Sequence, residues 1–180
     1  MAIKSTVFKA ELQVNDLDRH YYQTHALTLA RHPSETDERM MIRLLAFALN
    51  ADPQLAFGGD VGTQDEPSLW CKDLTGAIRS WIEVGLPEPR LLRKAAGRSD
   101  TVMVYAYGRA ADLWWNEHRN LLSPIDALAI WKIPTTTSLA LAALARRSMQ
   151  LQCLVQDGDA TFSDGATSVT VERVELKPAR

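Results

Sequence analysis

Hydrophobic and polar residues alternate along the first thirty residues of the chain. In residues 3–14 the apolar members fall on even positions, which predicts a half-buried strand. Residues 15–18 are typical of a turn, and residues 21–30 form a second, weaker alternating stretch. The pattern therefore predicts that the chain begins with a β-hairpin or the first two strands of a meander.

A helix is predicted over residues 39–50. Ser34 and Asp37 have the spacing of a capping box, with aspartate in the place that glutamate or glutamine usually takes. On this helix Glu38 lies within about 60° of the apolar residues, whereas Arg39 and Arg43 lie on another side. An ionised carboxylate that faces a core is costly unless it is paired or binds a cation. Glu38 is therefore a candidate ligand, and the alternative is that it reaches water or pairs with an arginine.

Residues 77–107 are the stretch around which the rest of the chain is organised. They predict a strand to Val84, a turn, a helix over residues 88–98 and a strand over residues 101–107. A right-handed crossover of this length makes two parallel strands, and ligands in open α/β sheets lie at the carboxyl ends of such strands. Glu83 stands at that end of the first strand. The alternative for Glu83 is a structural ion pair with Arg79 or with an arginine of the next helix.

The remaining segments complete a mixed α/β fold. Residues 51–64 are predicted to be a loop, and residues 68–73 a strand that pairs as an antiparallel hairpin with the strand of Glu83. Further along we expect a helix with Trp114 and Trp115, a strand over 125–133, and a helix over 139–145 capped by residues 135–138. The tail predicts three strands, over 149–155, 160–163 and 169–176.

Composition and charge narrow the classes of function. A chain of 180 residues with 46% hydrophobic and 23% charged residues is expected to form a single domain over residues 1–180. A formal net charge of −2 argues against tight sequence-independent binding of nucleic acid. The two cysteines have no metal-type spacing, and no signal segment or membrane-length apolar run is present. We expect a cytoplasmic monomer with no membrane association.

Three acidic positions could converge with one base on a metal site. Glu38 comes from the first helix, Glu83 from the central strand, and Asp65 or Glu66 from the start of the hairpin. Converging carboxylates make an oxygen-rich site that suits Mg²⁺ or Mn²⁺. Lys94, on the crossover helix, would orient a water or steady a phosphate. Spacing alone is a weak signal, because acidic residues are common.

Longer segments of the chain resemble the YaeQ family over nearly its whole length. These segments are Arg31-His32-Pro33-Ser34-Glu35-Thr36, Glu38-Arg39-Met40-Met41, Asp65-Glu66-Pro67, Trp81-Ile82-Glu83-Val84-Gly85-Leu86-Pro87, Trp114-Trp115 and Gln156-Asp157-Gly158. The resemblance implies a compact variant of the PD-(D/E)XK restriction-endonuclease-like core, with an added N-terminal hairpin and C-terminal β-hairpins. It also implies a constellation similar to the Mg²⁺ site of those nucleases. It does not bring an established reaction.

Two positions of the nuclease motif can be placed on this sequence through the resemblance. Glu83 takes the place of the acid in the (D/E)XK strand. Two residues later, where the motif has lysine, this chain has Gly85. The basic group is then expected at Lys94, with Lys72 on the neighbouring strand as the second choice. The missing lysine puts turnover in doubt more than metal binding.

For the other acids of the motif, more than one residue of this sequence is a candidate. The first acid would be Glu66 or Asp65, with Asp73 still open, and Glu38 matches the helix glutamate of many such sites. Catalytic roles are thus assigned to Glu38, Glu66, Glu83 and Lys94, and metal binding to Glu38, Asp65, Glu66 and Glu83. The cofactor would be Mg²⁺ or Mn²⁺.

Two functions follow from these residues. The first is a Mg²⁺-dependent nuclease or phosphodiesterase-type hydrolase, whose metal would lower the pKa of a bound water. The second is a non-catalytic regulator on a degenerate nuclease fold that binds nucleic acid or a protein and keeps its buried acids as ion-pair partners. The mild acidity of the chain favours the second function, or a small phosphodiester substrate over long duplex DNA.

Overall fold

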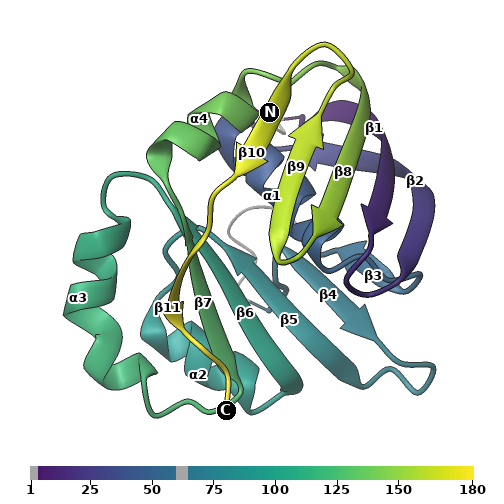
Figure 1. The fold of residues 1–180 in the computed structure, drawn as a ribbon. Helices are drawn as coiled ribbons and strands as arrows, with labels where there is room; N and C mark the ends of the chain where they lie inside the picture. Colours follow the sequence, from purple (N-terminus) through teal and green to yellow (C-terminus); the bar gives the residue numbers. More distant parts are fainter. Residues whose placement is uncertain (1–3, 60–64) are drawn as a thin grey trace. The chain divides into compact units, whose positions relative to one another are not determined.

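The computed structural model describes residues 4–59 and 65–180, which form two compact units (Figure 1). Unit 1 comprises Met1–Ala51 and Thr136–Glu172, and unit 2 comprises Asp52–Thr135 and Arg173–Arg180. The chain thus leaves unit 1 after its first helix, builds most of unit 2, returns to unit 1, and ends in unit 2. Each unit contains a sheet of its own.

Unit 1 is built on a five-stranded sheet of order β10-β9-β8-β1-β2. Its strands are β1 (Thr6–Asp16), β2 (Tyr21–Arg31), β8 (Ser148–Gln156), β9 (Asp159–Ser163) and β10 (Ser168–Val171). The predicted hairpin is confirmed, because β1 and β2 pair antiparallel. In addition β1 pairs in parallel with β8, so the N-terminal and C-terminal strands share one sheet. No local pattern predicts this pairing, because the paired residues lie about 140 positions apart in the chain.

The alternating hydrophobic and polar residues of β1 are alternately buried and exposed, as predicted. Phe8, Ala10, Leu12 and Val14 are buried, and the residues between them are exposed. In β8 the odd positions from Met149 to Val155 are buried in the same way. One face of this sheet is therefore core.

Two helices belong to unit 1, α1 (Asp37–Leu49) and α4 (Thr135–Ala142), the second of which begins at the unit boundary. The N-cap of α1 is Thr36, whose Oγ1 accepts the N–H of Arg39 at 3.1 Å, so the capping box predicted at Ser34 is wrong. Residues 40–48 of α1 are all buried. The threonines expected to cap the helix over 139–145 lie inside α4 instead.

Unit 2 is built on a six-stranded mixed sheet of order β11-β7-β6-β5-β4-β3. Its strands are β3 (Leu55–Phe57), β4 (Leu69–Lys72), β5 (Ile78–Val84), β6 (Ser99–Tyr107), β7 (Leu128–Ile133) and β11 (Val174–Lys177). The crossover predicted over residues 77–107 is confirmed, since β5 and β6 are parallel and α2 (Pro89–Ala96) connects them. The antiparallel hairpin of β4 and β5 is confirmed as well.

Helices α2 and α3 (Ala111–Leu122) share a core with the unit 2 sheet. Leu92 and Ala95 of α2 and Trp114 and Leu122 of α3 pack with the buried residues of β5, β6 and β7. The indole N–H of Trp114 donates to the Pro87 carbonyl at 3.0 Å and so ties α3 to the turn before α2. Trp114 is thus a core residue with a satisfied donor rather than a platform for stacking bases.

Two predictions about strands were wrong. The strand predicted over residues 169–176 is two strands, β10 in the unit 1 sheet and β11 in the unit 2 sheet. The loop predicted over 51–64 contains β3, and its residues 60–64 lie outside the described residues. Alternation alone cannot show that the chain passes from one sheet to the other, because β10 and β11 are both strands with the same two-residue period.

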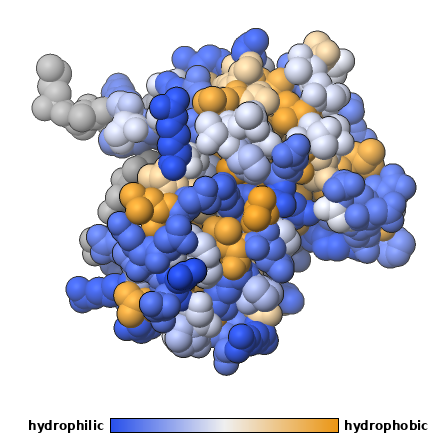
Figure 2. Space-filling model, turned by 60° about the vertical axis from the view of Figure 1, so that its left-hand side comes forward, coloured by the Kyte–Doolittle hydropathy of each residue, from blue (hydrophilic) through white to orange (hydrophobic). Residues whose placement is uncertain are grey.

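Among the described residues, no helix is long and apolar enough to cross a membrane. On the face drawn in Figure 2, hydrophobic residues form separate groups among hydrophilic residues. No single apolar surface dominates that face.

Candidate functional site

Glu83 lies at the carboxyl end of β5, on the same face of the strand as Trp81. Its side chain is buried, with the residue 8% exposed, and Trp81 is buried more completely. In the parallel pairing with β6, Glu83 is opposite Val104, which is also buried. The structure therefore places this acid at the sheet edge where the sequence predicted it.

Two neutral donors orient the carboxylate of Glu83. The indole N–H of Trp81 donates to Oε1 at 2.9 Å, and the hydroxyl of Ser68 lies 3.5 Å from Oε2. The Ser68 hydroxyl in turn accepts the backbone N–H of Val84 at 3.3 Å. Ser68 directly precedes β4, so the antiparallel neighbour of β5 holds the acid from the other side. These contacts fix where the two oxygens point.

Sequence reasoning missed both of these donors. From the sequence, Trp81 is predicted only as part of the strand of Glu83, and Ser68 only as the first residue of the neighbouring strand. The pairing of Leu69 with Ile82 brings Ser68 beside Glu83, but a bulge between Cys71 and Lys72 shifts this register by one residue, so the predicted hairpin alone does not give it. The signal for Trp81 was its position two residues before Glu83, which puts both side chains on one face.

Gly85 stands where the nuclease motif has lysine, and its backbone conformation suits glycine. Its φ is +109°, a value that L side chains rarely adopt. Its N–H donates to the Tyr105 carbonyl at 3.0 Å, which continues the contact of β5 with β6. A lysine at this position would strain the end of the strand.

Lys94 is brought together with Asp65, one of the two acids proposed at the start of the hairpin. The ammonium lies 3.2 Å from the carboxylate, and the side chains are 57% and 78% exposed. Glu66, the neighbouring acid, is exposed too. Exposed pairs of this kind contribute little to stability, so Lys94 can exchange Asp65 for another anion at small cost.

A surface pocket of about 320 Å³ lies along α2, from the N-cap Glu88 to Lys94 in the last turn. It is lined by Glu88, Arg90, Leu91 and Lys94. Arg90 and Lys94 are one helical turn apart and project from the same side of α2. The lining thus carries two cations and one carboxylate, that of Glu88, and the two cations can contact a ligand that carries negative charge.

Two residues that the sequence left open have local partners. The Lys72 ammonium lies 3.6 Å from the centroid of the Trp70 ring, a cation–π contact. Asp73 accepts bonds from the hydroxyl and backbone of Thr75 and from the Ala77 N–H, and these bonds lower the pKa of its carboxyl. Asp73 therefore stabilises the turn between β4 and β5.

Glu38 belongs to unit 1 and is half-buried. The hydroxyl of Ser138, on α4, donates to its Oε1 at 3.0 Å. Its assignment as a metal ligand stays a prediction. Sequence reasoning also missed Glu35, whose carboxylate is buried and accepts from Arg39 and from two nitrogens, Nε and Nη2, of the Arg43 guanidinium.

Comparison with known proteins decides the family. The family model described as YaeQ protein matches residues 1–173. The chain belongs to the YaeQ family. The YaeQ protein of Salmonella typhi is 40% identical over 173 residues, which are 96% of each chain. The YaeQ protein of Escherichia coli (strain K12) is 40% identical over 172 residues, which are 95% of each chain.

Two solved YaeQ structures share the fold. The crystal structure of the YaeQ protein from Xanthomonas axonopodis pv. citri has a TM-score of 0.93 and 43% identity, and the match covers 98% of this chain and 99% of that chain. The YaeQ protein from Pseudomonas syringae has a TM-score of 0.92 and 34% identity, with 97% of both chains covered. The resemblance inferred from the sequence is thereby confirmed at the level of the family.

The donor set of this YaeQ chain can be tested against a divalent ion. Within either unit, among residues 4–59 and 65–180, no three His, Cys, Asp or Glu side chains form a group that could hold a metal. Mg²⁺, however, is usually bound by one or two carboxylates together with water and substrate phosphates. Glu83, with the Ser68 hydroxyl beside it, fits that simpler mode, and a cage of three acids within one unit does not form.

Proposed function

We propose that unit 2 of this YaeQ chain is a compact PD-(D/E)XK-like core that binds Mg²⁺ or Mn²⁺ at Glu83 and hydrolyses phosphodiester bonds. The observation that carries the proposal is the placement of Glu83. It is a buried acid at the carboxyl end of a central strand, with both oxygens oriented by Trp81 and Ser68. Carboxylates that bind metals are typically held by hydrogen bonds of this kind.

Each residue has a role that its surroundings support. Glu83 would hold the cation, and the hydrogen bonds from Trp81 and Ser68 would keep its oxygens in position. Lys94 would leave the exposed carboxylate of Asp65 and contact a phosphate, together with Arg90 across the pocket of α2. When bound, a divalent ion supplies a water of lowered pKa and stabilises charge on the phosphate. Asp65 and Glu66 are exposed and would face the bound substrate.

The proposal depends on unit 2 alone. Glu38, which was predicted as a third ligand, belongs to unit 1 and has its own partner in Ser138. A Glu38→Gln variant therefore tests the wider site separately from Glu83. The proposal predicts loss of cleavage in Glu83→Gln and retained cleavage in Glu38→Gln.

A cleavage assay tests the activity. The full chain is incubated with Mn²⁺ or Mg²⁺ and with single-stranded DNA, duplex DNA, RNA or bis(p-nitrophenyl) phosphate. We expect metal-dependent hydrolysis of at least one substrate, and loss of it in Glu83→Gln, which keeps the shape of the side chain. Glu117→Gln, on the exposed side of α3, is the matched control and should cleave normally. Equal hydrolysis by wild type and Glu83→Gln would contradict the proposal.

A second function, binding without catalysis, is favoured by one observation. At the position of the motif's lysine the chain has a glycine at positive φ, so the usual base cannot be restored there without strain. If no substrate is cleaved but Mn²⁺ or oligonucleotides bind in a manner that requires Glu83 or Lys94, the chain is a binder on a nuclease-like core. Absence of both cleavage and binding would reject both functions.

A further inference from the structure

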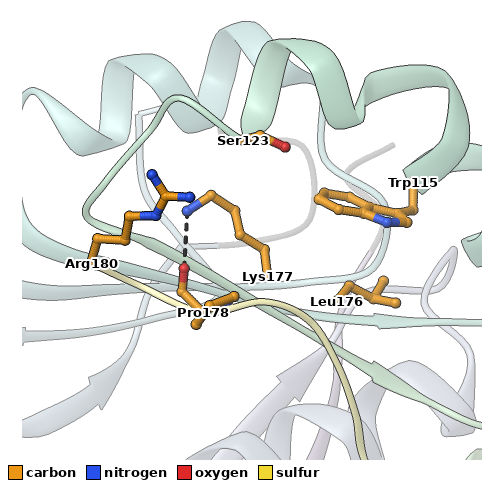
Figure 3. Close-up of a pocket in the computed structure, with 6 residues that line it drawn as sticks. All are labelled: Trp115, Ser123, Leu176, Lys177, Pro178 and Arg180. Carbon is orange, nitrogen blue, oxygen red and sulfur yellow. Dashed lines mark hydrogen bonds between the residues drawn. The ribbon is translucent and has the colours of Figure 1, made fainter.

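A second pocket of unit 2 lies between the end of α3 and the C-terminal strand β11. It has a volume of about 160 Å³ and is lined by Trp115, Ser123, Leu176, Lys177, Pro178 and Arg180. Figure 3 shows the ammonium of Lys177 and the guanidinium of Arg180 at one end, and the side chains of Trp115 and Leu176 at the other. None of these residues belongs to the site proposed around Glu83.

Lys177 is a buried cation that its own chain satisfies only in part. The residue is 5% exposed, and its ammonium donates to the Leu128 carbonyl at 2.7 Å and to the Pro178 carbonyl at 3.1 Å. A lysine ammonium has three donors, so one remains. Lys177 forms no ion pair with any residue in the described ranges 4–59 and 65–180. A buried charge without a counter-ion is costly, and an anion in the pocket would remove that cost.

The charges around Lys177 reinforce this reading. Burial is the largest cause that lowers the pKa of its ammonium, the positive charge of Arg180 lowers it further, and Asp126 acts in the opposite direction. The backbone N–H of Arg180 donates to the Asp126 carbonyl at 2.8 Å, which anchors this end of the chain. Arg180 thus affects the pKa of Lys177 more strongly than Asp126 does.

Size and polarity define the ligand. A cavity of roughly 150 Å³ accommodates one benzene ring, so the pocket has room for a small molecule and not for a nucleotide. One end offers a donor of Lys177 and the guanidinium of Arg180, a suitable pair for a carboxylate. The other end offers an indole and a leucine side chain. An inorganic anion would leave this apolar end unused.

We propose that this pocket is a binding site for a small organic carboxylate, with the carboxylate on Lys177 and Arg180 and the apolar body against Trp115 and Leu176. The inference is independent of the proposed hydrolase activity. A small acid would bind there between β11 and α3, next to the hydrogen bond that the Lys177 ammonium of β11 donates to the Leu128 carbonyl of β7.

Fluorine NMR of 4-fluorobenzoate with the full chain tests the proposal. We expect saturable binding with a dissociation constant on the order of 1 mM. Arg180→Gln changes an exposed residue and should fold normally, while Lys177→Met removes the buried charge and keeps the apolar stem. Each should weaken binding roughly tenfold or more, as expected for loss of a charge-assisted hydrogen bond. Arg109→Gln, another exposed arginine of unit 2, should bind like wild type.

Two further probes define the ligand class. 4-Fluorobenzyl alcohol has the same ring without the charge, and inorganic phosphate has charge without the ring. Both should bind at least about tenfold more weakly than 4-fluorobenzoate. Phosphate binding that equals 4-fluorobenzoate binding would overturn the organic carboxylate as the ligand. No saturable binding of 4-fluorobenzoate, or binding that Arg180→Gln leaves unchanged, would overturn the site itself.

Discussion

Each unit of the chain contains a buried glutamate, and the two are held in different ways. In unit 1, Glu35 accepts from Arg39 at 2.8 Å and from two nitrogens of Arg43 at 2.7 Å. In unit 2, the indole N–H of Trp81 donates to one carboxylate oxygen of Glu83 at 2.9 Å, and the hydroxyl of Ser68 lies 3.5 Å from the other. Glu35 thus neutralises arginine charge within the fold, whereas the contacts of Glu83 orient its oxygens.

We infer that the kind of donor, more than burial, distinguishes an acid that stabilises the fold from one that can bind a ligand. A bidentate arginine uses both oxygens of a carboxylate and matches its charge, so Glu35 has little left to offer a ligand. A neutral donor holds a carboxylate in one direction and brings no positive charge of its own. The following variants test whether Glu35 is needed for folding and Glu83 for chemistry.

The largest effect is expected from Glu35→Gln. This change leaves the buried guanidinium of Arg43 without its carboxylate, which should lower the free energy of unfolding by about 3–5 kcal/mol. Chemical denaturation measures the loss. The control is Asp37→Asn, which removes the acid of the more exposed pair with Arg31 and should cost less than about 1 kcal/mol. Equal losses in the two variants would show that Glu35 has no special structural role.

Ser68→Ala should have an intermediate effect. The variant removes the hydroxyl that contacts Glu83 and accepts the Val84 N–H, and it should lower the free energy of unfolding by roughly 1–2 kcal/mol. It should also weaken Mn²⁺ binding, because Glu83 loses one of its orienting contacts. Ser148→Ala, at an exposed position of β8, is the control. Unchanged Mn²⁺ affinity in Ser68→Ala would mean that orientation of Glu83 by this hydroxyl is irrelevant to the ion.

The lowered pKa of Lys177 should make the free energy of unfolding depend on pH. Its pKa in the folded protein lies below the ordinary value of 10.5, so between these two values the unfolded chain holds more protons. Raising the pH through this window should therefore stabilise wild type relative to Lys177→Met. Below the window the difference between the two should be constant. Urea denaturation at a series of pH values measures this, and a difference that moves the other way would refute the assignment.

The smallest effect on stability is expected from Lys94→Met. The pair with Asp65 is exposed, so the free energy of unfolding should change by less than about 0.5 kcal/mol. Oligonucleotide binding or cleavage should fall, because Lys94 is assigned to phosphate. Lys132→Met breaks another Lys–Asp pair of unit 2 and should leave oligonucleotide binding unchanged. If the two variants behave alike, the cations of α2 have no role in binding.

Local patterns predicted most of the elements, and long-range pairing accounts for what they missed. The crossover from β5 through α2 to β6 was visible because each part has its own period and boundary residues. The parallel pairing of β1 with β8, and the change of sheet between Val171 and Val174, leave no such trace. They depend on segments far apart in the sequence, whose proximity only the fold supplies.

The candidate site, too, could be predicted from local sequence patterns only in part. The position of Glu83 at the end of a central strand followed from local pattern, and so did the absence of lysine at position 85. The contacts of Ser68 and Ser138 with the two proposed acids depend on register and on packing of distant elements. The Arg43–Glu35 pair is more local, because Glu35 directly precedes the N-cap of α1 and Arg43 lies within that helix.

The most direct test of the central claim is calorimetric titration of Mn²⁺ into the full chain and its Glu83→Gln and Glu117→Gln variants. We predict one Mn²⁺ site per chain in wild type and in Glu117→Gln, with affinity reduced at least about tenfold in Glu83→Gln. The same Mn²⁺ affinity in all three proteins, or no binding by the folded wild-type chain, would contradict the account.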